Sequence, residues 1–274
     1  FAFAEVMSRP ELGTLIPSGS MNPTTRVASV GNPYLEPIRA KSYDAGLEWY
    51  FDEGALASVA YFEKDIDTYI QSISSLVPYS TLGLPDTLLE GSSATPSDLF
   101  TATRSTNTPG GPLKGYELNL QLPFTFLPSF WQDFGVLANY THVTSDINYV
   151  LQSANGVPTL TTTNDLVGLS KDAASGTIYY ENDLFSFRTT GSYRSGYLRA
   201  IPSGGNDSDV LGNKSTFFVD ASASYNLTDN VKLMLEAQNL TDERNTLYID
   251  SVRQDTLFET RMGRTFTLGV TAKF

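Results

Sequence analysis

The residues that could do chemistry are few and scattered. His142 is the only histidine and the chain has no cysteine, so neither a histidine-based metal cluster nor a thiolate site can form. Acid pairs such as Asp44 with Glu48, or Asp207 with Asp209, have the oxygen atoms for calcium binding or acid–base work. Acidic residues occur all along the chain, however, and we interpret these pairs as solvated or as lining a polar interior. The sequence therefore predicts no catalytic residue, no metal site, no cofactor and no enzyme.

Two other sets of side chains have the chemistry to contact a ligand. Arg188 and Arg194 fall on one side of a predicted strand, and we interpret them as lumen-facing residues that pair with carboxylates. Aromatic residues in the predicted loops could stack on a sugar or an aromatic chelate, or could pack within the loops or at a membrane interface. These loop aromatics are Tyr79, Phe100, Tyr149, Tyr197 and Tyr248.

Charge and hydropathy restrict the class of protein. The formal net charge is −12 and the sequence pI is near 4.5, which argues against binding a nucleic-acid backbone, because that requires clustered Lys and Arg. No run of about 18 apolar residues occurs, so the sequence predicts no transmembrane helix. The many Tyr and Phe residues and the absence of long helical periodicity favour a β-sheet protein.

The last stretch of the chain shows the pattern that organises the rest. Residues 264–274 alternate between apolar and polar side chains up to the final residue, as a strand does when its two faces meet different surroundings. A soluble protein seldom ends on an exposed aromatic residue. This alternation is typical of a transmembrane β-barrel strand, with one face in hydrocarbon and the other facing a polar lumen.

The same alternation recurs along the chain and predicts about ten strands. For residues 55–70 two facings remain open, since Leu56 and Phe62 compete with Val59 and Tyr61. The connections alternate between short turns and long, irregular loops, as in outer-membrane barrels. Short turns fall at about 52, 130, 182 and 229, and long outer loops at about 10–38, 72–112, 150–172, 199–214 and 246–255. The fold class predicted is an all-β, antiparallel transmembrane β-barrel.

Several phrases in this order are similar to TonB-dependent outer-membrane receptors. The segment Asn32–Pro37 followed by Ser42–Phe51 resembles a passage of that family, and Tyr61–Ile66 resembles one of its strand ends. Gln238–Glu243 resembles its NLTDE phrase near the end of the penultimate strand, and Arg264–Phe274 its closing strand. Together these phrases span nearly the whole chain.

The resemblance implies a larger protein in the bacterial outer membrane. Its members carry a plug domain and a TonB-contacting segment ahead of about 22 strands. Because ten strands of such a barrel cannot close, residues 1–274 are expected to be the C-terminal portion of the barrel. The resemblance further implies import of a scarce ligand from the extracellular face with TonB-transmitted energy. The expected partners are outer-membrane lipid, TonB, the barrel-assembly machinery, which would read Phe274 as its signal, and an iron chelate, cobalamin or oligosaccharide.

Two other functions are compatible with the β-rich pattern. One is a complete ten-stranded outer-membrane hydrolase, for which His142 has no acid partner that the sequence identifies. The other is a soluble β-rich carbohydrate-binding or adhesion module, whose apolar faces would be buried between two sheets.

Overall fold

Strands make up most of the protein, and its helices are single turns. The computed structural model describes residues 1–154, 157–201 and 209–273. Its helical turns are α1 (Leu12–Leu15), η1 (Tyr79–Thr81), η2 (Asp86–Leu89) and η3 (Ser129–Asp133). Among the described residues, no helix is both long enough and apolar enough to cross a membrane.

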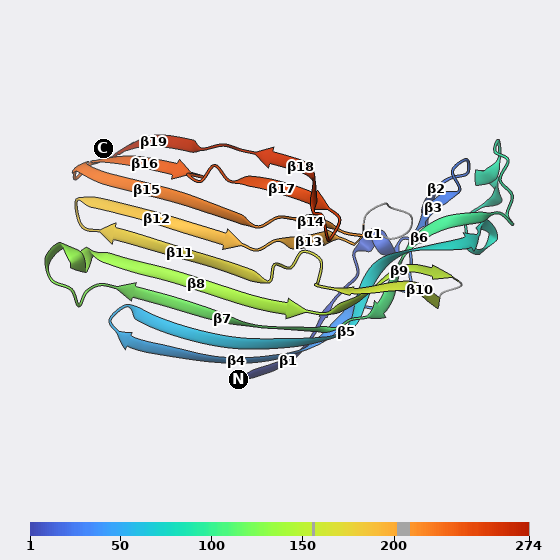
Figure 1. Ribbon diagram of the computed structural model, residues 1–274, viewed down its shortest axis with the longest axis horizontal. Coiled ribbons are helices and arrows are strands. Elements are labelled where there is room, and N and C mark those ends of the chain that lie inside the picture. Colours follow the sequence, from blue (N-terminus) through green and yellow to red (C-terminus); the bar gives the residue numbers. More distant parts are fainter. Residues whose placement is uncertain (155–156, 202–208, 274) are drawn as a thin grey trace.

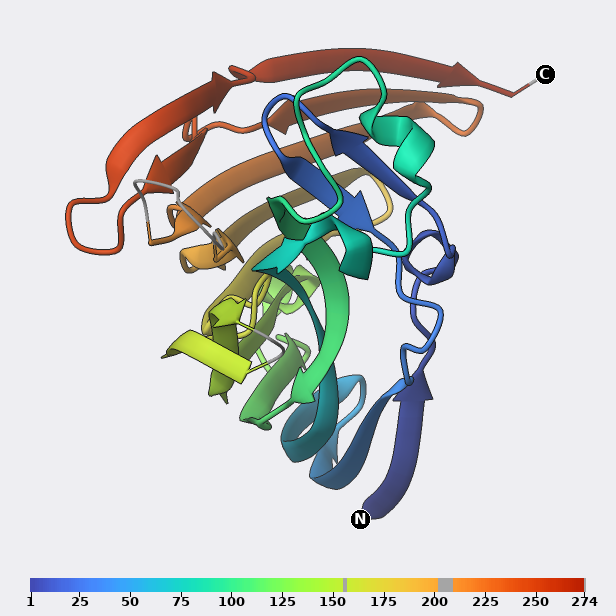
Figure 2. The same ribbon diagram turned by 90° about the vertical axis from the view of Figure 1, so that its right-hand side faces the viewer.

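Ten strands form one continuous antiparallel sheet, which we call the wall, with each strand beside its chain neighbour in the sheet (Figure 1). Seen from its end, the wall curves into an open arc (Figure 2). The predicted ten-stranded, all-β membrane-barrel architecture is therefore confirmed as part of a barrel that does not close on itself. The wall strands are β1 (Ala2–Ser8), β4 (Ile38–Asp52), β5 (Ala55–Pro78), β7 (Pro112–Pro123), β8 (Phe134–Ser145), β11 (Asp172–Glu181), β12 (Phe185–Arg194), β15 (Thr216–Thr228), β16 (Val231–Gln238) and β19 (Thr265–Ala272).

The connections divide between the two rims as the sequence predicts. The turns β4–β5, β7–β8, β11–β12 and β15–β16 all lie at the left of Figure 1, and we call this end the short-turn rim. The five longer connections lie at the opposite end, the long-connection rim. The last described strand, β19, runs toward the short-turn rim, whereas Phe274 itself lies outside the described residues.

The long connections contain more regular structure than the sequence predicts. Strand β5 continues past the wall and pairs with β6 (Leu99–Pro109), and β6 pairs in turn with a hairpin of β2 (Gly19–Asn22) and β3 (Val27–Val30). The prediction of an irregular segment at 72–112 is therefore wrong. These strand segments extend beyond the wall and need no apolar face, so Ser and Thr stand where wall strands alternate apolar and polar residues. The Ser74 and Thr103 hydroxyls, for example, form a hydrogen bond across the β5–β6 pair at 2.9 Å.

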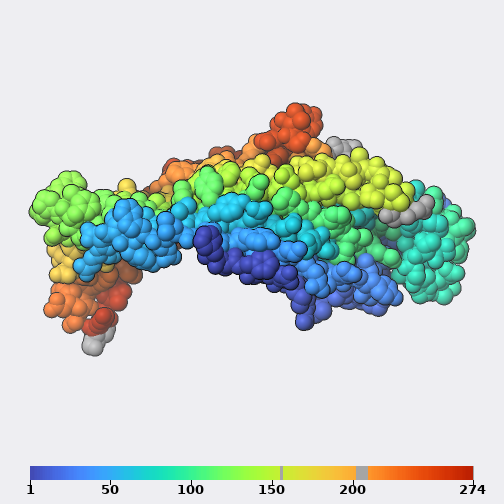
Figure 3. All heavy atoms as spheres, turned by 90° about the horizontal axis from the view of Figure 1, so that it is seen from below, coloured from blue at the N-terminus to red at the C-terminus, as the bar shows by residue number. Residues whose placement is uncertain are grey.

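Two further groups of strands stand on the long-connection rim. Strands β9 (Ile147–Ala154) and β10 (Val157–Asn164) pair with each other, and β9 also contacts β5 through the pair Ser75 and Ser153. A separate four-stranded sheet is built from β13 (Tyr197–Ala200), β14 (Leu211–Asn213), β17 (Arg244–Ile249) and β18 (Asp255–Arg261). The segment between β5 and β6, teal in Figure 3, forms the far tip of the molecule.

Strand register separates the wall into an apolar and a polar face. Residues paired across antiparallel strands point to the same side of the sheet, and the next row points to the other side. One row consists of Tyr180, Phe187, Ala223, Leu235 and Leu268. The row beside it consists of Tyr179, Arg188, Ser222, Glu236 and Thr267.

In the described part of the chain, large side chains of the apolar face are exposed rather than covered by protein. Leu268 is 77% exposed and Leu47 is 68% exposed, values that suit contact with hydrocarbon rather than water. Register also settles the facing of β5, because Val59 and Tyr61 pair with Leu118 and Tyr116 of the apolar face. The buried hydrophobic cluster lies elsewhere, at the far tip beyond the wall.

A polar corner after β16 joins the wall to the rim. Asn239 has a φ of +54°, a left-handed conformation that Asn tolerates better than most residues. Its side-chain amide donates to the carbonyls of Glu243 and Gly263 at 3.2 and 3.1 Å and accepts from the Glu243 N–H at 2.7 Å. The Asn239 N–H donates to the Asp220 carboxylate at 2.7 Å. The NLTDE phrase is thus a structural joint between β15, β16 and β19.

This joint makes a specific stability prediction. Asn239→Ala removes four side-chain hydrogen bonds, including the one that the Thr241 hydroxyl donates at 3.3 Å, and places Ala in the left-handed region that Asn tolerates better, so we expect it to destabilise the protein by roughly 2–4 kcal/mol. Asn239→Gly should lose less, because Gly keeps that conformation. The control is Asn226→Ala, which removes one exposed bond to the Asp183 carbonyl. The stability of the three variants is measured by the urea concentration at the unfolding midpoint of the membrane-inserted protein. Equal midpoints for Asn239→Ala and Asn226→Ala would refute the structural role of Asn239.

Candidate ligand-binding rim

Two of the predicted ligand-binding aromatics form the core of the far tip. Tyr79 and Phe100 are both 0% exposed, with ring centroids 5.2 Å apart. The Tyr79 hydroxyl donates to the Pro85 carbonyl at 2.5 Å. Leu82 and Leu89 pack in the same cluster. Because neither ring presents a face to the outside, the structure favours the packing role for both residues and gives them no contact surface for a ligand.

Tyr149 and Tyr248 are also buried and act as structural side chains. Tyr149 is 6% exposed; its hydroxyl donates to the Asp165 carbonyl at 3.1 Å and accepts from the Val167 N–H at 2.9 Å. Burial is the main reason why the pKa of Tyr149 is raised to about 12. Tyr248 packs directly over Gly212, where a Cβ would lie only 2.5 Å from the ring.

Tyr197 and the two arginines have different surroundings. The Arg194 guanidinium lies 4.0 Å from the centre of the Tyr197 ring and donates to the Ser170 hydroxyl at 2.7 Å and the Gly168 carbonyl at 2.9 Å. Arg194 therefore anchors the connection before β11. Arg188 lies 6.0 Å from the Tyr179 ring. Neither arginine forms an ion pair with a carboxylate in the described part of the chain, contrary to the pairing that the sequence predicts.

His142 has an acid partner that the sequence does not reveal. Register places it opposite Asp172, and its Nδ1 lies 2.8 Å from the Asp172 carboxylate, which also accepts the Tyr140 hydroxyl at 2.6 Å. The imidazole stacks on Tyr116 at 5.4 Å. These residues belong to the apolar face near the long-connection rim, where aromatic side chains with polar tips suit a membrane interface. We interpret the group as part of that interface.

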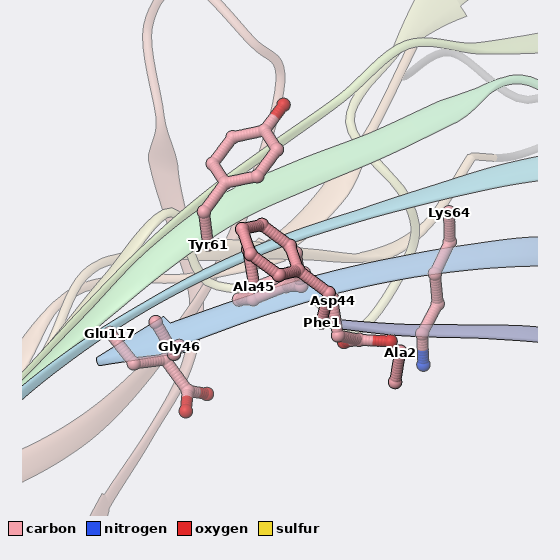
Figure 4. A pocket seen from close by; sticks show the side chains of 10 residues that line it. Phe1, Ala2, Asp44, Ala45, Gly46, Tyr61, Lys64 and Glu117 are labelled. Carbon is pink, nitrogen blue, oxygen red and sulfur yellow. The ribbon is translucent and has the colours of Figure 1, made fainter. Parts of the chain in front are cut away.

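A hollow at the open edge of the wall has no arrangement of side chains suited to catalysis or metal binding in the described residues. Beside β1, a hollow of about 560 Å³ spans the sheet edge, and Tyr61 points to one side whereas Lys64 and Glu117 point to the other (Figure 4). This hollow therefore lies at the unpaired edge of β1 and not inside the wall. In the described residues, no group of three or more His, Asp or Glu side chains is arranged to hold a metal ion.

A second hollow is enclosed by strands of the long-connection rim. It measures about 350 Å³ and lies between the β5–β6 pair and the β9–β10 hairpin. Its lining combines apolar side chains such as Ile73 and Val77 with hydroxyls and with a single cation, Arg104. Sequence reasoning missed this cleft, because the only signal was one Arg within a Ser- and Thr-rich segment assigned to an irregular loop.

The packing role of Phe100 leads to a direct test. Phe100→Ala should remove about 3–5 kcal/mol from the stability of the far tip, whereas Phe100→Leu should cost about 1.5 kcal/mol or less. Hydrogen–deuterium exchange of residues 79–102 measures this loss of local stability. The control is Phe130→Ala, because Phe130 lies on the short-turn rim and is 52% exposed. If Phe100→Leu abolished ligand binding on intact cells without changing exchange, the packing role would be wrong.

Solved structures share this fold at low sequence identity. A mutant of the ferric enterobactin receptor PfeA from Pseudomonas aeruginosa has a TM-score of 0.65 and 18% identity; the match covers 99% of this chain and 37% of that receptor. The siderophore receptor PirA from Acinetobacter baumannii has a TM-score of 0.62 and 15% identity, with 99% and 38% covered. The ferric-catecholate import receptor Fiu from E. coli has a TM-score of 0.60 and 18% identity, with 99% and 32% covered.

The chain thus spans between 32% and 38% of the length of these receptors, and at such identities the likeness shows the fold alone. The family is shown by the sequence itself, because residues 1–240 match the family described as TonB dependent receptor-like, beta-barrel. The proteins of this family are transport receptors of the bacterial outer membrane and not enzymes. Membership of the family is incompatible with the two alternative functions, a ten-stranded outer-membrane hydrolase and a soluble carbohydrate-binding or adhesion module. The chain belongs to the TonB-dependent receptor-like β-barrel family.

Proposed function

We propose that this chain forms the C-terminal part of an outer-membrane receptor that binds an iron chelate at its extracellular rim and imports it with energy transmitted by TonB. The observation that carries the proposal is the division of the wall into a short-turn rim and a long-connection rim, with one apolar and one polar face. Outer-membrane barrels carry their long loops outside the cell. The long-connection rim is then the extracellular one.

Two free strand edges support the proposal that the wall continues beyond this chain. Strands β1 and β19 each pair on one side only among the described residues. In hydrocarbon each unpaired backbone group costs several kcal/mol, so both edges require further strands. A TonB-contacting segment and a plug would lie in that further part. Phe274, beyond the described end of β19, keeps its proposed role as the assembly signal.

The polar face supplies the surface that a transport path requires. Hydroxyl, amide and charged side chains follow one another along it, and Arg188, Asp220 and Glu236 line a shallow hollow there. Such a face keeps the lumen wetted, whereas the apolar face excludes water from the lipid. In the proposed receptor this polar face surrounds the path from the outer rim to the periplasm.

The ligand class is supported by the names of the structural relatives. PfeA is a ferric enterobactin receptor, PirA a siderophore receptor and Fiu a ferric-catecholate import receptor. We therefore propose an iron chelate for this chain, ahead of cobalamin or an oligosaccharide. The net charge of −12 repels anions at long range, so an anionic chelate would bind only where basic side chains of the rim face it.

Uptake by living cells tests the proposal. Cells that produce the protein should accumulate radiolabelled iron from a ferric chelate, whereas cells lacking the gene, or cells lacking TonB, should fall to background. Cobalamin and maltooligosaccharides serve as parallel substrates. Accumulation of cobalamin or sugar but not iron would overturn the ligand class, and uptake that persists without TonB would overturn the energy coupling.

A further inference from the structure

We propose that the cleft between the β5–β6 pair and the β9–β10 hairpin is an anion subsite, in which Arg104 holds one flat, acidic arm of the imported chelate. This inference rests on the proposed function and names the place and chemistry of ligand contact. The cleft is lined by strands from three separate parts of the chain, so the chelate would be held by the folded rim rather than by a single loop.

The walls of the cleft are fixed in position. The Gln71 side chain donates to the Asn148 carbonyl at 2.8 Å and accepts from the Val150 N–H at 2.9 Å, which fastens β9 to β5. Gln71 is 6% exposed. The hydroxyls of Ser75 and Ser153 bond at 2.5 Å on the same side. A cleft with walls fixed in this way needs little reorganisation to accept a ligand, and this lowers the cost of binding.

The charge of the lining is uncompensated. Arg104 is exposed, and no Asp or Glu of the described residues lines the cleft. Among the described residues Arg104 forms no ion pair, whereas Arg26 on the neighbouring β2–β3 hairpin is paired with Asp98 at 3.2 Å. Most Lys and Arg side chains of the described residues likewise form no ion pair, but Arg104 is the basic side chain that lines this cleft. A guanidinium binds carboxylate or catecholate oxygens through two parallel hydrogen bonds, so the preferred ligand group is anionic.

Size and lining specify the rest of the ligand group. The cleft volume of about 350 Å³ lies near the lower end of the range for small-molecule sites, enough for one substituted ring but not for a whole chelate with three such arms. Beside Arg104 the lining is apolar on one side, with Ile73 as its direct cross-strand partner and Ala102 two residues away, and it carries a hydroxyl on the other side, at Thr106. An aromatic ring with acidic oxygens at one edge matches both parts of this surface.

The position of the cleft connects it with the transport path. A register shift between Arg39 and Ala40 in the β4–β5 pair leaves Asp67 unmatched and reverses the alternation along β5. Beyond the shift, Gln71 and Ile73 therefore continue the polar face of the wall and not the apolar face. A ligand released from the cleft would leave on the side of the lumen.

Binding to whole cells tests the assignment. We compare the native protein with Arg104→Gln and Arg104→Lys, and Arg26→Gln is the matched control because it removes a neighbouring exposed cation. The probes are radiolabelled ferric enterobactin, an anionic triscatecholate, and a neutral ferric trihydroxamate, each with de-energised cells so that binding alone is measured. A folded band resistant to sodium dodecyl sulfate without heating shows that each variant is assembled.

We expect Arg104→Gln to weaken binding of the anionic probe about ten- to a hundredfold, the usual effect of losing a charge-assisted contact. Arg104→Lys should retain part of the affinity, and Arg26→Gln all of it. Unchanged binding by an assembled Arg104→Gln variant, or an equal loss with Arg26→Gln, would overturn the subsite while leaving the proposed function intact. If the native protein binds neither probe and imports no ferric chelate, the proposed function fails and the subsite fails with it.

Discussion

The backbone of a membrane-spanning sheet must satisfy its own hydrogen bonds, because hydrocarbon supplies no partner. Each of the eight inner strands of the wall, β4 through β16, pairs with a wall strand on both sides. The same pairing fixes the register that gathers Phe187, Leu235 and Leu268 on one face and Arg188 and Glu236 on the other. A one-residue slip would exchange the faces and place charge in lipid.

Beyond the wall this constraint is relaxed and a different architecture appears. Where water can reach both faces, strands no longer need an apolar side, and β5 runs on into a Ser- and Thr-rich pair with β6. Order there comes from a small hydrophobic cluster around Tyr79 and Phe100 and from buried polar ties such as Gln71. The order of the rim therefore depends less on lipid than the order of the wall does, and in the proposed receptor the rim would carry ligand specificity.

The sequence predicts the wall well because the period-2 pattern is local and lipid enforces it on every strand. It predicts the rim poorly because the strands there lack that pattern, and burial of Tyr149 or Phe100 depends on segments distant in the chain. The partner of His142 lies 30 residues away and becomes visible only through the register of β8 with β11. Because burial by distant segments cannot be read from the sequence, the sequence predicts the loop aromatics as ligand contacts. The structure buries four of these five residues, and the proposed ligand contact is Arg104 instead.

The two-faced wall is the central claim, and accessibility along one strand tests it most directly. Because the sequence contains no cysteine, single cysteines carrying a spin label can be introduced at each position from 217 to 225 of β15 in the membrane-inserted protein. Collision with oxygen, which concentrates in lipid, should be high at 217, 219, 221, 223 and 225 and low at the positions between them. Collision rates without this alternation, or with its phase reversed, would contradict the account.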